Sequence, residues 1–153
     1  MLLKPISSLS SSLTFLAASL PSALLTPIYK KVAGHIVGHL HQRLIYHRSK
    51  GRFTTVAGTR FRAQCHIWVQ SCELALRGGA ATAKVRRPEA GWEKIQDVAT
   101  LLSIGEAEVG DVRVAFDDGE EPYTQLCEQL GLNGSLSLDE AQAVLRARAD
   151  TRR

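Results

Sequence analysis

Two histidines one helical turn apart, in the stretch HIVGHLH (residues 35–41), have the spacing that metal ligands adopt on a helix. Zinc hydrolases with an HExxH motif place a glutamate between two such histidines, where it acts as the general base. Here that position is Ile36, and an aliphatic side chain cannot accept a proton from zinc-bound water. His41 lies about 200° around a helix from His39, so it does not complete a ligand set. The sequence therefore predicts no metal site and no cofactor at His35 and His39.

A longer helical pattern explains these histidines better. Apolar residues recur every four positions from residue 28, and this spacing predicts one apolar stripe on an amphipathic helix. The stripe consists of Ile28, Val32, Ile36, Leu40 and Leu44. The neighbouring row consists of Lys31, His35, His39, Arg43 and His47, which are cationic or can become so. Such a helix can lie on an anionic membrane, dock on nucleic acid, or bury its stripe in an ordinary protein core.

The basic pattern continues through HRSKGRFTTVAGTRFR (residues 47–62), where cations alternate with Phe53 and Phe61. Arg and Lys can neutralise phosphates while a phenylalanine stacks on an exposed base, although a short strand flanked by charges has the same pattern. The predicted anionic-surface residues are Lys31, His35, His39, Arg43, Arg48, Lys50, Arg52, Arg60 and Arg62. The predicted apolar face toward a membrane or protein partner is Val32, Ile36, Leu40 and Leu44.

The net charge of +4 hides a strong asymmetry along the 153 residues. Residues 1–72 contain nine Lys and Arg and no Asp or Glu, whereas residues 73–153 carry a net charge of −5. Charge separated in this way indicates two parts with different surroundings.

The N-terminal segment has 24 uncharged residues (6–29), which Lys4 and Pro5 precede and Lys30 follows. An organellar targeting peptide would be poor in acids and rich in serine, as this segment is. A single-pass membrane anchor would have this length, but the many serines and two internal prolines weaken it. A secretory signal is a third interpretation, with Pro21 in place of a small residue of its cleavage site. The three cysteines include no C-x-x-C pair, which favours a reducing interior.

The C-terminal part combines helical and alternating patterns. Val112, Val114 and Phe116 alternate before a turn and predict a strand, with residues 81–86 or 53–57 as its partner. The last stretch predicts a helical hairpin that turns at Gly131 and resumes with a capping box of Ser137 and Glu140. This hairpin is faintly similar to a degenerate EF-hand, but Gln129 and Gly131 stand where calcium ligands are needed.

These patterns predict an α+β protein that is mostly α-helical. We expect residues 1–29 to be a targeting peptide or membrane anchor, residues 30–79 a basic amphipathic helical region, and residues 80–153 a small acidic α+β domain. No catalytic motif is present, which disfavours an enzyme. The expected function is that of a non-catalytic accessory or adaptor protein of mitochondria or another organelle. Its basic region would contact an anionic surface and its C-terminal domain a protein partner. The alternative is an RNA-binding component of an organellar ribosome or RNA complex.

Overall fold

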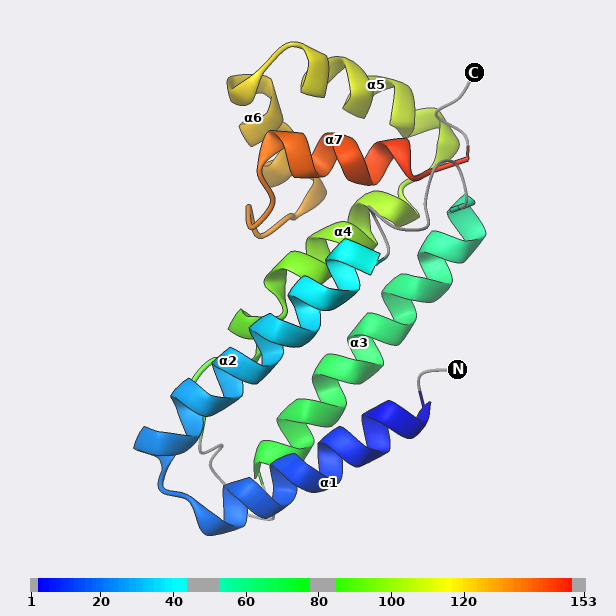
Figure 1. Ribbon diagram of the computed structural model, residues 1–153. Helices are drawn as coiled ribbons and strands as arrows, with labels where there is room; N and C mark the ends of the chain where they lie inside the picture. The colour runs from blue at the N-terminus through cyan, green and yellow to red at the C-terminus, as the bar shows by residue number, and fades with distance from the viewer. Residues whose placement is uncertain (1–2, 44–52, 78–84, 150–153) are drawn as a thin grey trace.

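The computed structural model describes residues 3–43, 53–77 and 85–149, and these residues are almost entirely helical (Figure 1). The elements are α1 (Leu3–Ser19), α2 (Ser22–His41), α3 (Thr55–Arg77), η2 (Pro88–Gly91), α4 (Glu93–Ser103), α5 (Glu106–Asp117), α6 (Glu120–Leu130) and α7 (Leu138–Arg146). Within the described ranges the only β-pairing is an isolated bridge between Phe53 and Arg148. The predicted α+β class is therefore wrong, and the fold is all-α.

The strand expected around residue 114 is part of helix α5. Its buried residues are Val109, Val112 and Phe116, which are spaced three and four apart, whereas Val114 is 60% exposed. The residue types at Val112, Val114 and Phe116 are compatible with a strand as well as with a helix. The buried positions, however, follow the period of a helix. The two partner segments expected for that strand do not supply one. Residues 55–57 begin α3, residues 81–84 lie outside the described residues, and Val85 is buried in a bend.

The long helix α3 is central to the packing. It lies alongside α1 on one side and packs closely on α4 on the other, while α2 packs on η2 and α4 (Figure 1). Gly58 makes the α3–α4 contact possible, because a Cβ atom there would lie 1.8 Å from the carbonyl oxygen of Leu102. Gly58 lies inside α3, at the point where the two helices cross.

Aromatic residues join α2, α3 and η2 in the core. The rings of Trp68 and Trp92 pack with centroids 6.0 Å apart. The Trp92 indole N–H donates to the hydroxyl of Tyr29 (2.7 Å), which donates in turn to the carbonyl of Pro88 (2.9 Å). Burial raises the pKa of Tyr29 to about 12, so this hydroxyl remains a hydrogen-bond donor.

The uncharged N-terminal segment forms two helices in place of one span. α1 ends at Ser19 and α2 begins at Ser22, with Pro21 as the N-cap residue of α2. Leu13 and Ala17 of α1 are buried, as are Leu25 and Tyr29 of α2, so both helices contribute to the core. In the described part of the chain, no helix has both the length and the hydrophobicity needed to cross a bilayer.

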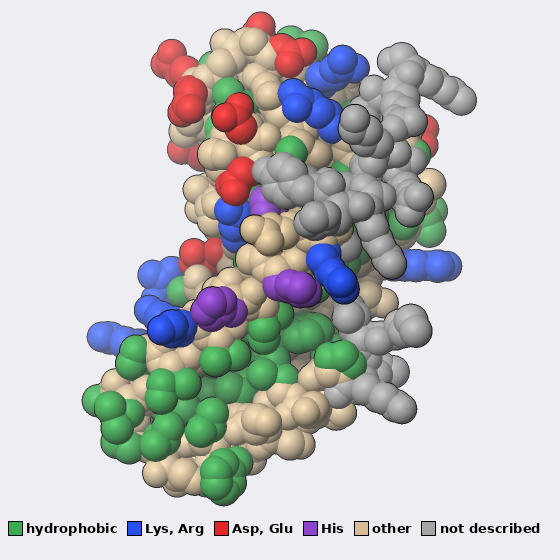
Figure 2. Space-filling model, viewed as in Figure 1, with side chains coloured by type: hydrophobic (Ala, Val, Ile, Leu, Met, Phe, Trp, Pro, Cys, Tyr) green, Lys and Arg blue, Asp and Glu red, His purple; other side chains and the backbone are tan. Residues whose placement is uncertain are grey.

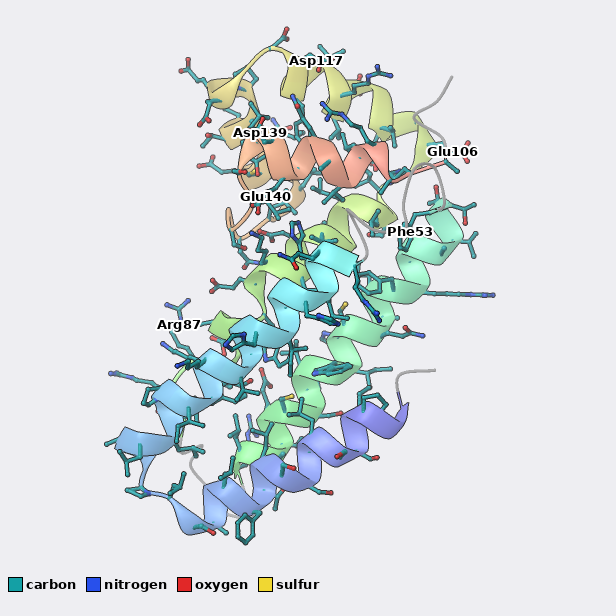
Figure 3. All side chains as sticks on the ribbon, in the orientation of Figure 1. Phe53, Arg87, Glu106, Asp117, Asp139 and Glu140 are labelled. Carbon is teal, nitrogen blue, oxygen red and sulfur yellow. The ribbon has the colours of Figure 1, made fainter. Side chains whose placement is uncertain are left out.

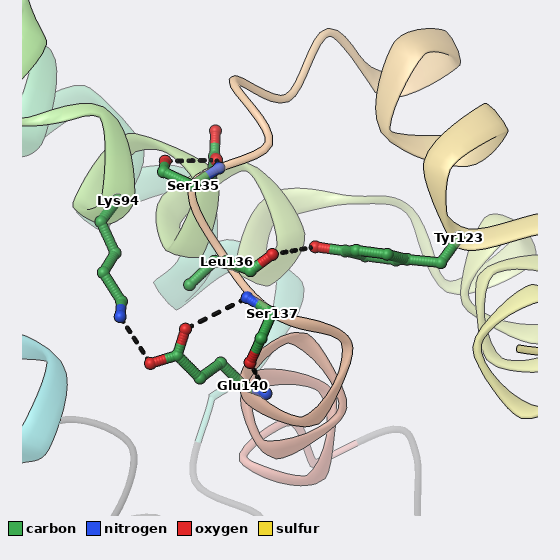
Figure 4. A network of polar contacts seen from close by, with 7 residues as sticks. Lys94, Tyr123, Ser135, Leu136, Ser137 and Glu140 are labelled. Carbon is green, nitrogen blue, oxygen red and sulfur yellow. Dashed lines mark hydrogen bonds and ion pairs between the residues drawn. The ribbon is translucent and has the colours of Figure 1, made fainter. Parts of the chain in front are cut away.

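The predicted C-terminal hairpin is present as α6 and α7. α6 ends at Gly131 with φ of 65°, and the capping box is confirmed, because Ser137 and Glu140 each accept a hydrogen bond from the other's backbone N–H (Figure 4). α4 packs against α7 but also against α2 and α3. The C-terminal part is therefore continuous with the N-terminal helices and does not form a separate small domain.

The loop between α6 and α7 is held by a buried carboxylate. Asp97 of α4 is 1% exposed and accepts four hydrogen bonds of 2.8–3.0 Å. The donors are the backbone N–H and the side chain of both Asn133 and Ser135. The Asn133 amide and the Glu140 carboxylate thus serve the fold, since Asn133 binds Asp97 and Glu140 binds Lys94 (Figure 4).

Candidate functional site

The strongest surface feature is a set of exposed apolar side chains on α1 and α2, which we name the N-terminal apolar patch. Its members are Phe15, Leu24, Ile28 and Val32, which are 70%, 56%, 41% and 37% exposed. The three on α2 follow one another at intervals of four residues and therefore lie on one stripe of the helix. Figure 2 shows hydrophobic side chains gathered over this end of the molecule. Exposed apolar side chains that cluster in this way mark interaction surfaces.

The exposed apolar residues of α2 lie on a stripe that is rotated around the helix axis relative to the apolar face predicted from the sequence. Residues 25, 29, 33, 37 and 41 of α2 face the core, so Val32 is exposed while Ile36 and Leu40 are half-buried against the core. Ala33 and Gly91 approach closely, since a Cβ atom added at Gly91 would lie 2.7 Å from the Cβ of Ala33. Leu44, the last residue of the predicted face, lies outside the described residues.

A basic row runs beside the patch along α2. Lys31, His35, His39 and Arg43 are all exposed, as is Lys30. His35 and His39 line a shallow groove together with Gly34, Gly38 and Gln42. Helix positions three apart are offset by about 60°, so Lys31 adjoins Ile28 on the helix surface. Figure 2 shows the cationic and histidine side chains at the border of the hydrophobic surface.

The other predicted basic residues do not all join this row. Arg60 and Arg62 are exposed on α3, and Arg62 lines a different groove, shared with α4. Arg48, Lys50, Arg52 and the histidine at position 47 lie outside the described residues. The structure thus brings together the part of the predicted set that belongs to α2 and separates it from Arg62.

Acidic side chains gather at the opposite end of the molecule, over α5, α6 and α7 (Figure 2). Glu106, Asp117 and Asp139 are examples, all exposed at this end (Figure 3). The charge asymmetry of the sequence is therefore partly spatial, with most acidic side chains in this view over α5, α6 and α7 and the apolar patch at the other end.

The described residues offer little for catalysis or metal binding. They contain no group of three or more His, Cys, Asp or Glu that could hold a metal ion. Cys65, Cys72 and Cys127 are free and buried, and burial raises the pKa of Cys65 and of Cys72 to about 12. Thiols of this kind stay protonated at neutral pH and are poor nucleophiles.

His41 belongs to the buried face of α2, although the sequence predicted no role for it. This residue is 4% exposed and ends the buried stripe of α2, where burial and the nearby Lys94 lower the pKa of its imidazole, against a smaller opposing effect of Glu140. Its spacing of four residues from Val37 was the signal that could have placed it on the inward face.

The two phenylalanines considered for base stacking pack against each other. Phe53 and Phe61 have ring centroids 6.5 Å apart, and both are half-buried against the core. Stacking on a base would require a ring face that is open to solvent. The RNA contact at these two rings remains a prediction.

Comparison of the chain with protein-family models, with curated proteins and with solved structures gives no significant match.

Proposed function

We propose that this protein is a non-catalytic peripheral membrane protein that binds anionic lipid surfaces through α1 and α2. The observation that carries the proposal is the juxtaposition on α2 of an exposed apolar stripe and an exposed basic row, with no acidic residue on either helix. Amphipathic helices that lie in the membrane interface combine an apolar face with Lys and Arg beside it.

The charge distribution supports one orientation on such a surface. With the N-terminal apolar patch inserted among the lipid headgroups, the basic row meets the anionic lipids and the acidic end of α5–α7 points away. The reverse orientation would bring the acids toward like charge, which is unfavourable. The acidic end would then be open to a protein partner, which is the adaptor role predicted from the sequence.

The energetic requirement is modest. Each Lys or Arg close to an anionic bilayer contributes about 1 kcal/mol, and each buried CH₂ group about 0.8 kcal/mol. Two lysines together with partial burial of Leu24, Ile28 and Val32 therefore suffice for reversible binding. Replacing both Lys30 and Lys31 by Gln should lower partitioning roughly thirtyfold, since a free energy of about 1.4 kcal/mol is a factor of ten.

The decisive experiment is flotation of the purified chain with vesicles of phosphatidylcholine alone or of equimolar phosphatidylcholine and phosphatidylserine. The test variant carries Ile28→Asp with Val32→Asp, because both side chains are exposed and their replacement leaves the core intact. Substituting Ile36 and Leu40 would be a poorer test, since both pack against the core. The matched control is Val114→Asp, which changes an exposed valine at the acidic end of the molecule.

We expect the wild type and the Val114 variant to float with the anionic vesicles and the double variant to remain in the soluble fraction. Equal flotation of all three proteins would refute the proposed surface. Binding to single-stranded RNA with a steep salt dependence, in the absence of vesicle binding, would favour the alternative RNA-binding function. The location in mitochondria or another organelle remains a prediction, which fractionation of a C-terminally tagged chain tests.

A further inference from the structure

A second concave surface lies between α3 and α4, and it is separate from the residues of the N-terminal apolar patch. The two helices touch where Gly58 meets Leu102, and a groove of about 560 Å³ runs along them beside this contact. Its α3 wall includes Thr59, Arg62 and His66, and its α4 wall Gln96 and Thr100. Asn133, from the loop after α6, also lines it. A volume of roughly 300–1,000 Å³ is usual for small-molecule sites.

The groove contains cationic and polar groups but no carboxylate among its lining residues. Among the described residues, Arg62 donates a long hydrogen bond of 3.5 Å to the Ser103 hydroxyl. Within the described ranges no acidic side chain pairs with Arg62, whereas exposed Arg87 pairs with two glutamates. The guanidinium therefore has N–H donors to offer to a ligand.

His66 stands one helical turn from Arg62 on the same wall. The Gln70 side-chain nitrogen lies 2.9 Å from Nε2 of this histidine, so a hydrogen bond to Gln70 holds the imidazole ring in place. Asp97 binds Asn133, which lines the groove; this carboxylate is buried, and both of its oxygens accept hydrogen bonds from Asn133 and Ser135. The groove thus presents donors and a positive charge, while the neighbouring carboxylate is satisfied by the fold.

We propose that this groove binds a small organic oxyanion, a phosphate ester or a carboxylate, with Arg62 and His66 as its principal ligands. A planar guanidinium binds such groups through two parallel hydrogen bonds. The floor formed by Cys65 and Ala99 accommodates the apolar part of the ligand. The proposal is independent of membrane binding, because none of the patch residues lines the groove.

The test is titration of the full chain by calorimetry and by amide chemical shifts with glycerol 3-phosphate, succinate and, as the uncharged comparison, glycerol. Arg62→Gln removes the charge, and Ala63→Leu fills the groove without changing charge, since Ala63 also lines it. Arg60→Gln is the matched control. It removes the same charge from an exposed position of the same helix that does not line the groove. Circular dichroism and thermal unfolding establish that each variant is folded.

We expect saturable binding of at least one of the two anions, with shifts at residues of α3 and α4 that line the groove. Arg62→Gln should weaken binding by roughly tenfold to a hundredfold, as expected for loss of a charge-assisted hydrogen bond, and Ala63→Leu should abolish it. Arg60→Gln should change the affinity by less than about twofold, as expected for an exposed charge outside the site. Preference for glycerol 3-phosphate or for succinate identifies the class of anion.

Three results would overturn the proposal. The first is absence of saturable binding of either anion at millimolar concentration. The second is equal weakening by Arg60→Gln and Arg62→Gln, which would indicate diffuse attraction to a basic surface. The third is full binding by the Ala63→Leu variant. In each case the flotation of the same variants with anionic vesicles still reports separately on the membrane-binding proposal.

Discussion

Replacement of Gly58 by alanine tests the closest helix contact in the fold. Gly58 lies inside α3, and an added Cβ would lie 1.8 Å from the Leu102 carbonyl oxygen and 2.4 Å from its carbonyl carbon. Both of these atoms belong to the backbone of α4, so they cannot turn away as a flexible side chain would.

The cost follows from this geometry. A Cβ atom essentially never lies closer than 3.0 Å to another non-bonded heavy atom. To accommodate one at position 58, α3 and α4 must therefore move apart by more than 1 Å at their crossing. Overpacking of this kind costs about 1–3 kcal/mol and occasionally more. Alanine gains about 1 kcal/mol over glycine in a helix interior, which offsets part of that cost. We expect a net loss of about 1 kcal/mol in the free energy of unfolding, or roughly 2–4 °C in Tm for a chain of this size.

Urea denaturation followed by circular dichroism measures this loss, and Gly110→Ala is the matched control. Gly110 also lies inside a helix, α5, but its added Cβ would meet no atom within 4 Å. That variant should gain stability, by about 0.5–1 kcal/mol. The two glycine-to-alanine changes should therefore have opposite signs. If Gly58→Ala stabilises the protein as much as Gly110→Ala does, α3 and α4 do not cross closely at this position, and the arrangement of the two helices described above is wrong.

Three further predictions concern buried polar groups. Arg148 is 0% exposed and donates to the Leu101 carbonyl (2.9 Å), so Arg148→Met should lower the free energy of unfolding by about 1–3 kcal/mol; an unchanged urea midpoint would contradict this. Asp97→Asn removes the carboxylate that holds the α6–α7 loop and should cost about 2–3 kcal/mol, with faster amide hydrogen exchange at Asn133 and Ser135 as the local sign of the change. The pKa of His41 is lowered in the folded state, so the unfolded chain binds the proton more tightly. Stability should therefore fall as the pH drops below the ordinary value of 6.5, by at most about 1.4 kcal/mol per pH unit, until the folded-state pKa is passed. A His41→Gln variant should show a smaller loss over the same range, and an identical pH profile for both proteins would exclude His41 as the cause.

The sequence by itself determined the local features. Gly131 sets the C-terminal end of α6, and the Ser137–Glu140 capping box sets the N-terminal end of α7. Both signals act within one helical turn. The absence of acids before residue 73 likewise made every charged side chain on the N-terminal helices a basic one. Such features need no information about distant parts of the chain.

Tertiary packing decided the rest. The residue types around Val112 are compatible with either a strand or a helix. The helix forms because helical spacing lets its apolar side chains be buried against other helices. On α2, two adjacent apolar stripes could have faced inward. Tyr29 and Ala33 were selected because Trp92 and Gly91, some 60 residues later in the chain, supply a hydrogen bond and room for a close approach. That choice left Ile28 and Val32 exposed beside Lys31, and so created the surface to which we assign membrane binding. The groove at Arg62 has the same origin, since its walls come from α3, α4 and a loop that are distant in sequence and meet only in the folded chain.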